Sequence, residues 1–132
     1  MRARAILPRM MTTSELDAFF EQGWNRHDVD RLMSFMAEEC VFESASGPEA
    51  CGGRHVGREA VRSAFARIFE AFPDVRFDGT RHVVAGDRAV SEWRFTGTAA
   101  DGRRVEVDGC DLFTVAGGKI ARKSSFLKTR TG

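Results

Sequence analysis

The sequence predicts an α+β domain in which three N-terminal helices pack on the concave side of a curved, mainly antiparallel sheet, forming a cone. Apolar residues recur at helical spacing in the first half of the chain. After Pro73 the apolar period changes from 3.6 residues to 2, which is typical of strands. Helices followed by consecutive strands favour separate helical and sheet layers over alternating βαβ units.

The first helix is predicted over residues 13–25. Thr12 and Glu15 match a capping box. An apolar stripe at helical spacing follows this box: Leu16, Phe19, Phe20 and Trp24. Asp28 is a good N-cap for a second helix, whose apolar side carries Val29, Leu32, Met33 and Met36.

Residues 40–43 indicate a short strand, and residues 44–57, rich in Gly, Pro and Ser, indicate a loop. A third helix is expected to follow and to end at Pro73. Its apolar side would carry Val61, Phe65, Ile68, Phe69 and Phe72, and its outer side Arg58, Arg62 and Arg67.

Four strands are predicted near residues 75–84, 88–97, 103–115 and 119–128, joined by glycine-containing turns. The chain is expected to form one domain over residues 13–132, preceded by a flexible extension over residues 1–12.

The composition limits the function classes. Of the 132 residues 42% are apolar, and 20 basic residues nearly balance 19 acidic ones, so net charge does not favour nucleic-acid or membrane binding. No apolar run approaches a membrane span. Three cysteines without a close pair indicate a reducing compartment, and we expect a cytoplasmic protein. The cysteines and histidines lack metal-ligand spacing, so neither a metal nor another cofactor is expected.

One pair of charged residues stands out among the strands. If residues 116–118 form a three-residue hairpin loop, Asp111 faces Lys123 and Gly109 faces Ser125. An Asp and a Lys together in an apolar cone could polarise a carbonyl group or move a proton. The alternative interpretation is an ordinary cross-strand salt bridge.

The neighbouring strand leaves two alternatives open. Hydrophobicity favours Trp93 and Phe95 facing the pocket. A two-residue turn at residues 101–102 would instead place Glu92 opposite Asp111, and the two interpretations agree only if the register shifts by one residue.

Several local motifs, in this order, resemble those of the SnoaL-like polyketide cyclase group, which shares the nuclear transport factor 2-like fold with the ketosteroid isomerases. They are Trp24-Asn25-Arg26-His27-Asp28, Gly57-Arg58-Glu59-Ala60-Val61, Phe72-Pro73-Asp74, Thr96-Gly97-Thr98 and Gly118-Lys119-Ile120. The resemblance covers about residues 13–128. It implies a cone-shaped, cystatin-like roll with a pocket for a small molecule, in many members as a homodimer.

The same resemblance places the known isomerase site on this sequence. The tyrosine of that site corresponds to Phe20, its general base to Ser44, and the acid of its oxyanion hole to Asp111. Cyclases of the SnoaL type carry an acid late in the last strand, where this chain has no carboxylate over residues 125–128.

We therefore expect a pocket for a small apolar molecule, such as a polyketide- or steroid-like ring. Asp111 and Lys123 are the candidate catalytic residues, for isomerase, cyclase, hydratase or dehydratase chemistry. The expected ligand-binding residues are Phe20, Trp24, Ser44, Trp93, Phe95, Phe113, Ser125 and Leu127. A non-catalytic binding domain and a dimeric scaffold are the alternatives. A homodimer is expected because Cys110, Leu112 and Phe126 would lie on the uncovered face of the sheet.

Overall fold

The computed structural model describes residues 9–131 and confirms the α+β prediction. The helical elements are α1 (Thr13–Ala18), η1 (Phe19–Trp24), α2 (Val29–Ser34) and α3 (Arg58–Ala71). The strands are β1 (Met36–Glu49), β2 (Gly52–Val56), β3 (Arg76–Ala85), β4 (Arg88–Thr98), β5 (Arg104–Ala116) and β6 (Lys119–Leu127).

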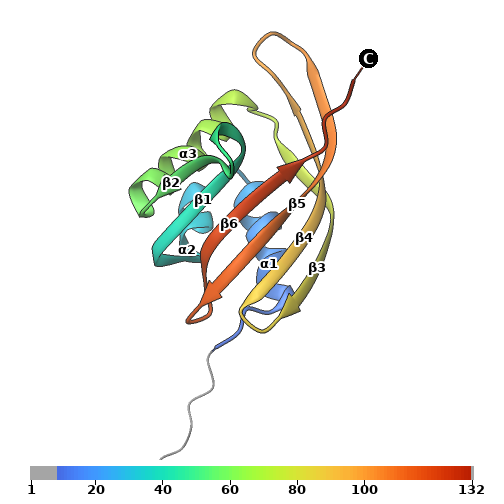
Figure 1. Cartoon of the computed structure of the whole chain (residues 1–132). Helices are drawn as coiled ribbons and strands as arrows, with labels where there is room; N and C mark the ends of the chain where they lie inside the picture. Colours follow the sequence, from blue (N-terminus) through green and yellow to red (C-terminus); the bar gives the residue numbers. More distant parts are fainter. Residues whose placement is uncertain (1–8, 132) are drawn as a thin grey trace, which may run out of the picture.

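All six strands form one sheet in the order β2-β1-β6-β5-β4-β3. Neighbouring strands are antiparallel except β1 and β6, which run parallel. The sheet curves, and in Figure 1 helices α1 and α2 lie behind it while α3 flanks β1 and β2. One face of the sheet is therefore covered by helices, and we call this the inner face and the opposite one the outer face.

The predicted helix starts are confirmed by their caps. The Thr12 side chain accepts from the Glu15 backbone N–H, and the Glu15 carboxylate accepts from the Thr12 backbone N–H. Asp28 caps α2 through the backbone N–H of Arg31. The first helix continues past Ala18 as a wider π-type turn, in which the N–H of Asn25 reaches the carbonyl of Phe20.

The loop predicted over residues 44–57 is wrong. Strand β1 continues to Glu49 and turns back into β2, with an irregular register between Ser44 and Glu49. Gly52, at φ 95°, sits where a Cβ would collide with the Ser44 carbonyl. The glycines and serines here build a bulged hairpin instead of a loop, and their composition hides the strand period.

The turn between β5 and β6 also differs from the prediction. Gly117 and Gly118 both have positive φ, as a two-residue type I′ turn requires, and they join Ala116 to Lys119. Ala121 is an extra residue in β6, so the pairing beyond it moves by one more position.

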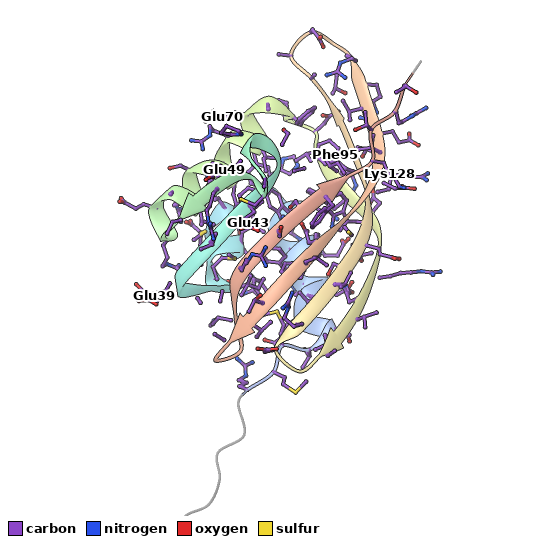
Figure 2. The ribbon with its side chains drawn as sticks, in the orientation of Figure 1. Glu39, Glu43, Glu49, Glu70, Phe95 and Lys128 are labelled. Carbon is purple, nitrogen blue, oxygen red and sulfur yellow. The ribbon has the colours of Figure 1, made fainter. Side chains whose placement is uncertain are left out.

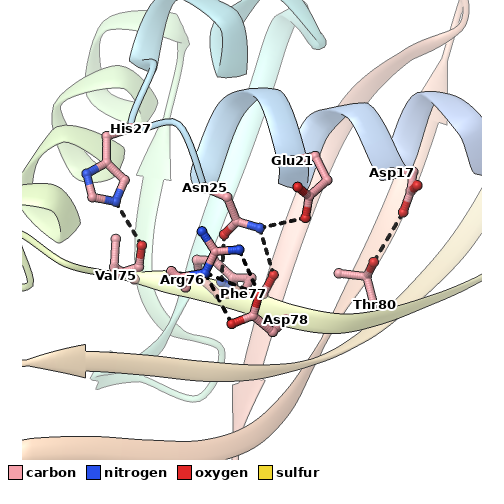
Figure 3. A network of polar contacts seen from close by, with 9 residues as sticks. All are labelled: Asp17, Glu21, Asn25, His27, Val75, Arg76, Phe77, Asp78 and Thr80. Carbon is pink, nitrogen blue, oxygen red and sulfur yellow. Dashed lines mark hydrogen bonds and ion pairs between the residues drawn. The ribbon is translucent and has the colours of Figure 1, made fainter.

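A side-chain amide joins the first helix to the far edge of the sheet (Figure 3). The Asn25 amide donates to the Phe77 carbonyl (2.9 Å) and its oxygen accepts from the Phe77 N–H (2.8 Å). The Asn25 side chain thus makes the pair of hydrogen bonds to Phe77 that a neighbouring strand would make. His27, at φ 53°, contacts the Val75 carbonyl through Nε2 at 2.8 Å. These contacts explain why polar residues follow Trp24 at the helix end.

Residues 1–8 of the expected extension lie outside the described residues. Met11, which the prediction placed in that extension, is 1% exposed and belongs to the core. Within the described part of the chain, no helix has the length and apolar character to cross a membrane.

Candidate functional site

Asp111 lies at the centre of a polar cluster on the inner face of the sheet, and it is 0% exposed. Its Oδ1 accepts from the Lys123 ammonium (3.0 Å) and from the Ser125 hydroxyl (2.5 Å). Its Oδ2 accepts from the indole N–H of Trp93 at 3.0 Å. Lys123 also donates to the Ser125 hydroxyl at 2.8 Å. Three residues on two neighbouring strands, β5 and β6, therefore share one hydrogen-bond network, which Trp93 joins from β4.

The predicted register of this cluster is wrong by two residues. Asp111 pairs with Ser125, and Lys123 pairs with Phe113, because of the two-residue turn and the bulge described above. A shift of two positions keeps every side chain on its own face of a strand. Asp111 and Lys123 are consequently diagonal neighbours, close enough for the ion pair.

Lys123 lies among aromatic rings and is only 2% exposed. Its Nζ is 4.7 Å from the ring centre of Phe42, 5.3 Å from that of Trp24 and 5.9 Å from that of Phe65. Burial lowers the pKa of the Lys123 ammonium, and the carboxylate of Asp111 opposes that shift. The pair is therefore an ion pair in apolar surroundings, where each charge depends on the other.

Trp93 and Phe95 face inward, as hydrophobicity favoured, and Glu92 and Arg94 face outward. Thr98 pairs with Arg104, so the loop comprises residues 99–103 and the register moves by one from that of a two-residue turn. As a result Ser91, not Glu92, lies opposite Asp111.

The structure brings together most, but not all, of the expected ligand-binding residues. Phe20, Trp24 and Phe113 are fully buried in the core beside the cluster. Ser44 is half-buried and its hydroxyl donates to carbonyl groups of the β1–β2 hairpin. Leu127 is 44% exposed and forms no part of the apolar wall, because β6 ends there and its partner Gly109 has no side chain to pack on it.

One buried donor at this site lacks a partner. The indole N–H of Trp24 has no hydrogen-bond acceptor among the described residues, although the side chain is fully buried. Its ring packs on Phe65 and Phe69 and approaches the Lys123 ammonium. A buried donor without an acceptor costs about 1–3 kcal/mol.

Sequence reasoning missed a second polar group on the inner face. His82 Nδ1 lies 2.7 Å from the Ser91 hydroxyl and its Nε2 lies 3.2 Å from the Asp17 carboxylate. The His82 ring stacks on Phe20. The alternation of β3 placed His82 on a face, but only the helix α1 packed above it supplies Asp17.

The outer face carries its own features. A hollow of about 930 Å³ crosses β3, β4, β5 and β6, and Glu92, Arg94, Cys110 and Phe126 are among the residues that line it. Glu43, labelled in Figure 2, lies on β1 on the same outer face. It is buried, and the guanidinium of Arg122 donates to its carboxylate at 2.5 and 2.9 Å. These hydrogen bonds lower the pKa of the Glu43 carboxyl.

No group of three His, Cys, Asp or Glu side chains within residues 9–131 gathers closely enough to hold a metal ion. The polar groups of the inner face are suited to hydrogen bonding and proton transfer with an uncharged ligand.

A family model of the SnoaL-like domain matches residues 16–123. The chain therefore belongs to the SnoaL-like family. No curated protein matches the sequence.

Solved structures share the fold along most of their length. A candidate polyketide cyclase of Xanthomonas campestris has 24% identity and a TM-score of 0.77, with 88% of this chain and 89% of that one covered. An uncharacterised cystatin-fold protein of Novosphingobium aromaticivorans has 23% identity and a TM-score of 0.73, over 89% and 99% of the two chains. TerC, co-crystallised with polyporic acid, has 20% identity and a TM-score of 0.71, over 86% and 88%. These likenesses show that the chain shares the fold of these structures.

Proposed function

We propose that this protein binds a small apolar compound with a carbonyl oxygen between its helices and sheet, and that Asp111 exchanges a proton with it. Lys123 would be the charge partner of Asp111, and the Ser125 hydroxyl, which donates to Asp111 in the free protein, would turn to donate to the ligand. The reaction class would be isomerisation, ring closure, hydration or dehydration, all of which need a proton to be moved.

The observation that supports this proposal most strongly is the buried network of Asp111, Lys123 and Ser125. Aromatic rings surround it, namely those of Trp24, Phe42, Phe65 and Trp93. A site with a few convergent polar groups in apolar surroundings is the usual form of a small-molecule site. The free indole N–H of Trp24 adds support, because a ligand oxygen would satisfy it. TerC, which shares the fold, has been co-crystallised with a small molecule, polyporic acid.

A non-catalytic binding domain is the second candidate. Two of the three polar roles of the isomerase site fall on Phe20, which has no hydroxyl, and on Ser44, whose hydroxyl is occupied by its own hairpin. Such a site would hold a ligand without turning it over.

The three cysteines are free, which supports a reducing compartment such as the cytoplasm.

We further propose that the protein forms a homodimer through its outer face. The dimeric scaffold, which is the other alternative to an enzyme, would use the same contact. Phe126 is 51% exposed there, next to the half-buried Cys110 and Leu112. An isologous contact with a second copy would cover them.

Intrinsic fluorescence tests the ligand site. The chain has two tryptophans, Trp24 and Trp93, and both adjoin the Asp111–Lys123 pair, so a bound aromatic ketone such as benzophenone should quench them. Asp111→Asn, checked for folding by circular dichroism, should weaken binding. Ser125→Ala removes a hydroxyl without leaving a charge and should also weaken it.

Asp108→Asn is the matched control, because Asp108 lies on the same strand but faces outward, where it pairs with Arg94. Equal affinity in Asp111→Asn, Ser125→Ala and the wild type would place the ligand away from this network. A ligand that binds but is never converted would favour the non-catalytic candidate.

A further inference from the structure

The choice of cation at the buried site is unusual for this chain. The sequence contains seventeen arginines and only three lysines: Lys119, Lys123 and Lys128. Two of these lysines are exposed, and the third is the buried partner of Asp111. Arginine is the usual cation of buried ion pairs, since its charge is permanent and its planar group binds a carboxylate with two hydrogen bonds. Lysine at this position instead supplies a cation that can lose its proton.

The surroundings of Lys123 desolvate its ammonium group. Three aromatic rings, from Trp24, Phe42 and Phe65, exclude water from Nζ. Desolvation lowers the pKa of this ammonium. A desolvated lysine in an apolar pocket is one of the ways in which proteins obtain an amine nucleophile at neutral pH.

The neighbours of Nζ are also those that amine chemistry needs. Asp111 Oδ1, at 3.0 Å, is placed to take a proton from the ammonium and to return it later. The Ser125 hydroxyl lies 2.8 Å from Nζ and 2.5 Å from the same carboxylate oxygen. Ser125 is only half-buried, so it is the member of the network that reaches the surface.

We propose that Lys123 is a nucleophile that forms an imine with an aldehyde or ketone ligand. This inference rests on the proposed function, namely that a carbonyl compound binds at this network. It goes further by making the contact covalent, and it restricts the ligand to compounds whose carbonyl carbon is open to attack by an amine.

The step balances within the site. Lys123 passes its ammonium proton to Asp111, and the neutral Nζ attacks the carbonyl carbon, forming a C–N bond while the oxygen takes up the proton that nitrogen loses. Asp111 then protonates the resulting hydroxyl, the C–O bond breaks and water leaves, giving a C=N bond. Nitrogen keeps one proton and Asp111 is again a carboxylate, so the net change is ammonium plus carbonyl to protonated imine plus water, with no oxidant or reductant. The imine makes the adjacent C–H acidic, and Asp111 is placed to accept that proton.

Reductive trapping tests the proposal. The full chain is incubated at pH 7 with benzaldehyde and sodium cyanoborohydride, which reduces an imine to a stable benzylamine. Peptide mapping by mass spectrometry follows adduct formation at each of the three lysines and at the N-terminal amine. Labelling of Lys123 is expected to exceed that of Lys119 and Lys128 by roughly tenfold or more, because a desolvated amine in an apolar pocket is the better nucleophile.

Two variants sharpen the result. Lys123→Arg keeps the positive charge beside Asp111 but cannot form an imine, so the fast label should vanish. Lys119→Arg with Lys128→Arg should leave it unchanged. Because the site-by-site comparison is made on the wild type, it remains valid even if a variant at position 123 fails to fold.

The outcomes separate the two proposals. Labelling of Lys123 that is no faster than that of the exposed lysines, in a protein whose tryptophans are still quenched by benzophenone, overturns the imine and leaves the proposed binding site standing. Absence of both quenching and fast labelling overturns the proposed function as well.

Discussion

At the scale of single residues, one carboxylate organises the inner face. Asp111 accepts hydrogen bonds from Lys123, Ser125 and Trp93, and it is fully buried. A buried charge of this kind is tolerated only while its partner is present, since an unpaired ion in apolar surroundings costs several kcal/mol. The pair need not make the fold more stable than an apolar pair would, which is consistent with its having a functional role.

A double-mutant cycle checks this dependence. Asp111→Asn and Lys123→Met should each lower the free energy of unfolding by about 3–5 kcal/mol, because each leaves the other charged group buried without its partner. The double variant should cost clearly less than the sum of the two, since no lone charge remains. Urea unfolding at pH 7, followed by tryptophan fluorescence, measures all four proteins. Additive costs would mean that the two side chains do not depend on each other.

At the scale of elements, a side-chain amide links the first helix to the edge of the sheet. The helix ends at Trp24, and the next residue, Asn25, occupies both the N–H and the carbonyl of Phe77 on β3. Strand β3 is the last strand of the sheet and has a strand partner on one edge only within residues 9–131, so the side-chain amide satisfies backbone groups that would otherwise be left unpaired. The helix is thereby held above Trp93 and Asp111.

Asn25→Ala should therefore destabilise the protein by about 1–3 kcal/mol, because two partly buried backbone groups of Phe77 lose their partners. The free energy of unfolding from urea titration is the measurement. Glu21→Gln is the control, since Glu21 contacts the same amide from an exposed position and should change little. A small effect for Asn25→Ala would show that water replaces the amide at no cost.

At the scale of the whole molecule, the two faces of the sheet differ. Helices cover the inner face, whereas the outer face keeps exposed Phe126 and a hollow that crosses four strands. An uncovered sheet face with apolar residues typically marks a contact surface. The proposed dimer would use this face and leave the Asp111 network intact, because that network lies on the other side.

Phe126→Asp should accordingly shift the protein toward the monomer in sedimentation-velocity experiments at micromolar concentration, since the isologous contact would bring both new charges into one interface. Met10→Asp is the control, a comparably exposed apolar side chain ahead of α1. A wild-type protein that is already monomeric would contradict the proposal. So would a Phe126→Asp variant with the sedimentation coefficient of the wild type.

The sequence predicts some elements of the fold and misses others. The predicted strands near 75–84, 88–97, 103–115 and 119–128 agree closely with β3 to β6, because each alternates apolar and polar residues between glycine turns. The β1–β2 hairpin was missed, because its bulge and glycines have no regular period. The helix caps at Thr12 and Asp28 were predictable because a cap is a local interaction of three or four residues.

The sequence by itself determined the layers, the family and the side of the sheet on which Asp111, Lys123 and Ser125 lie, because strand alternation and helix periodicity are local properties. Only the tertiary structure decided the register that brings these three groups together, the position of Trp93 on Asp111 and the pairing of His82 with Asp17. Those contacts depend on turn geometry, on one extra residue in β6 and on packing between segments far apart in the chain, none of which a local pattern encodes.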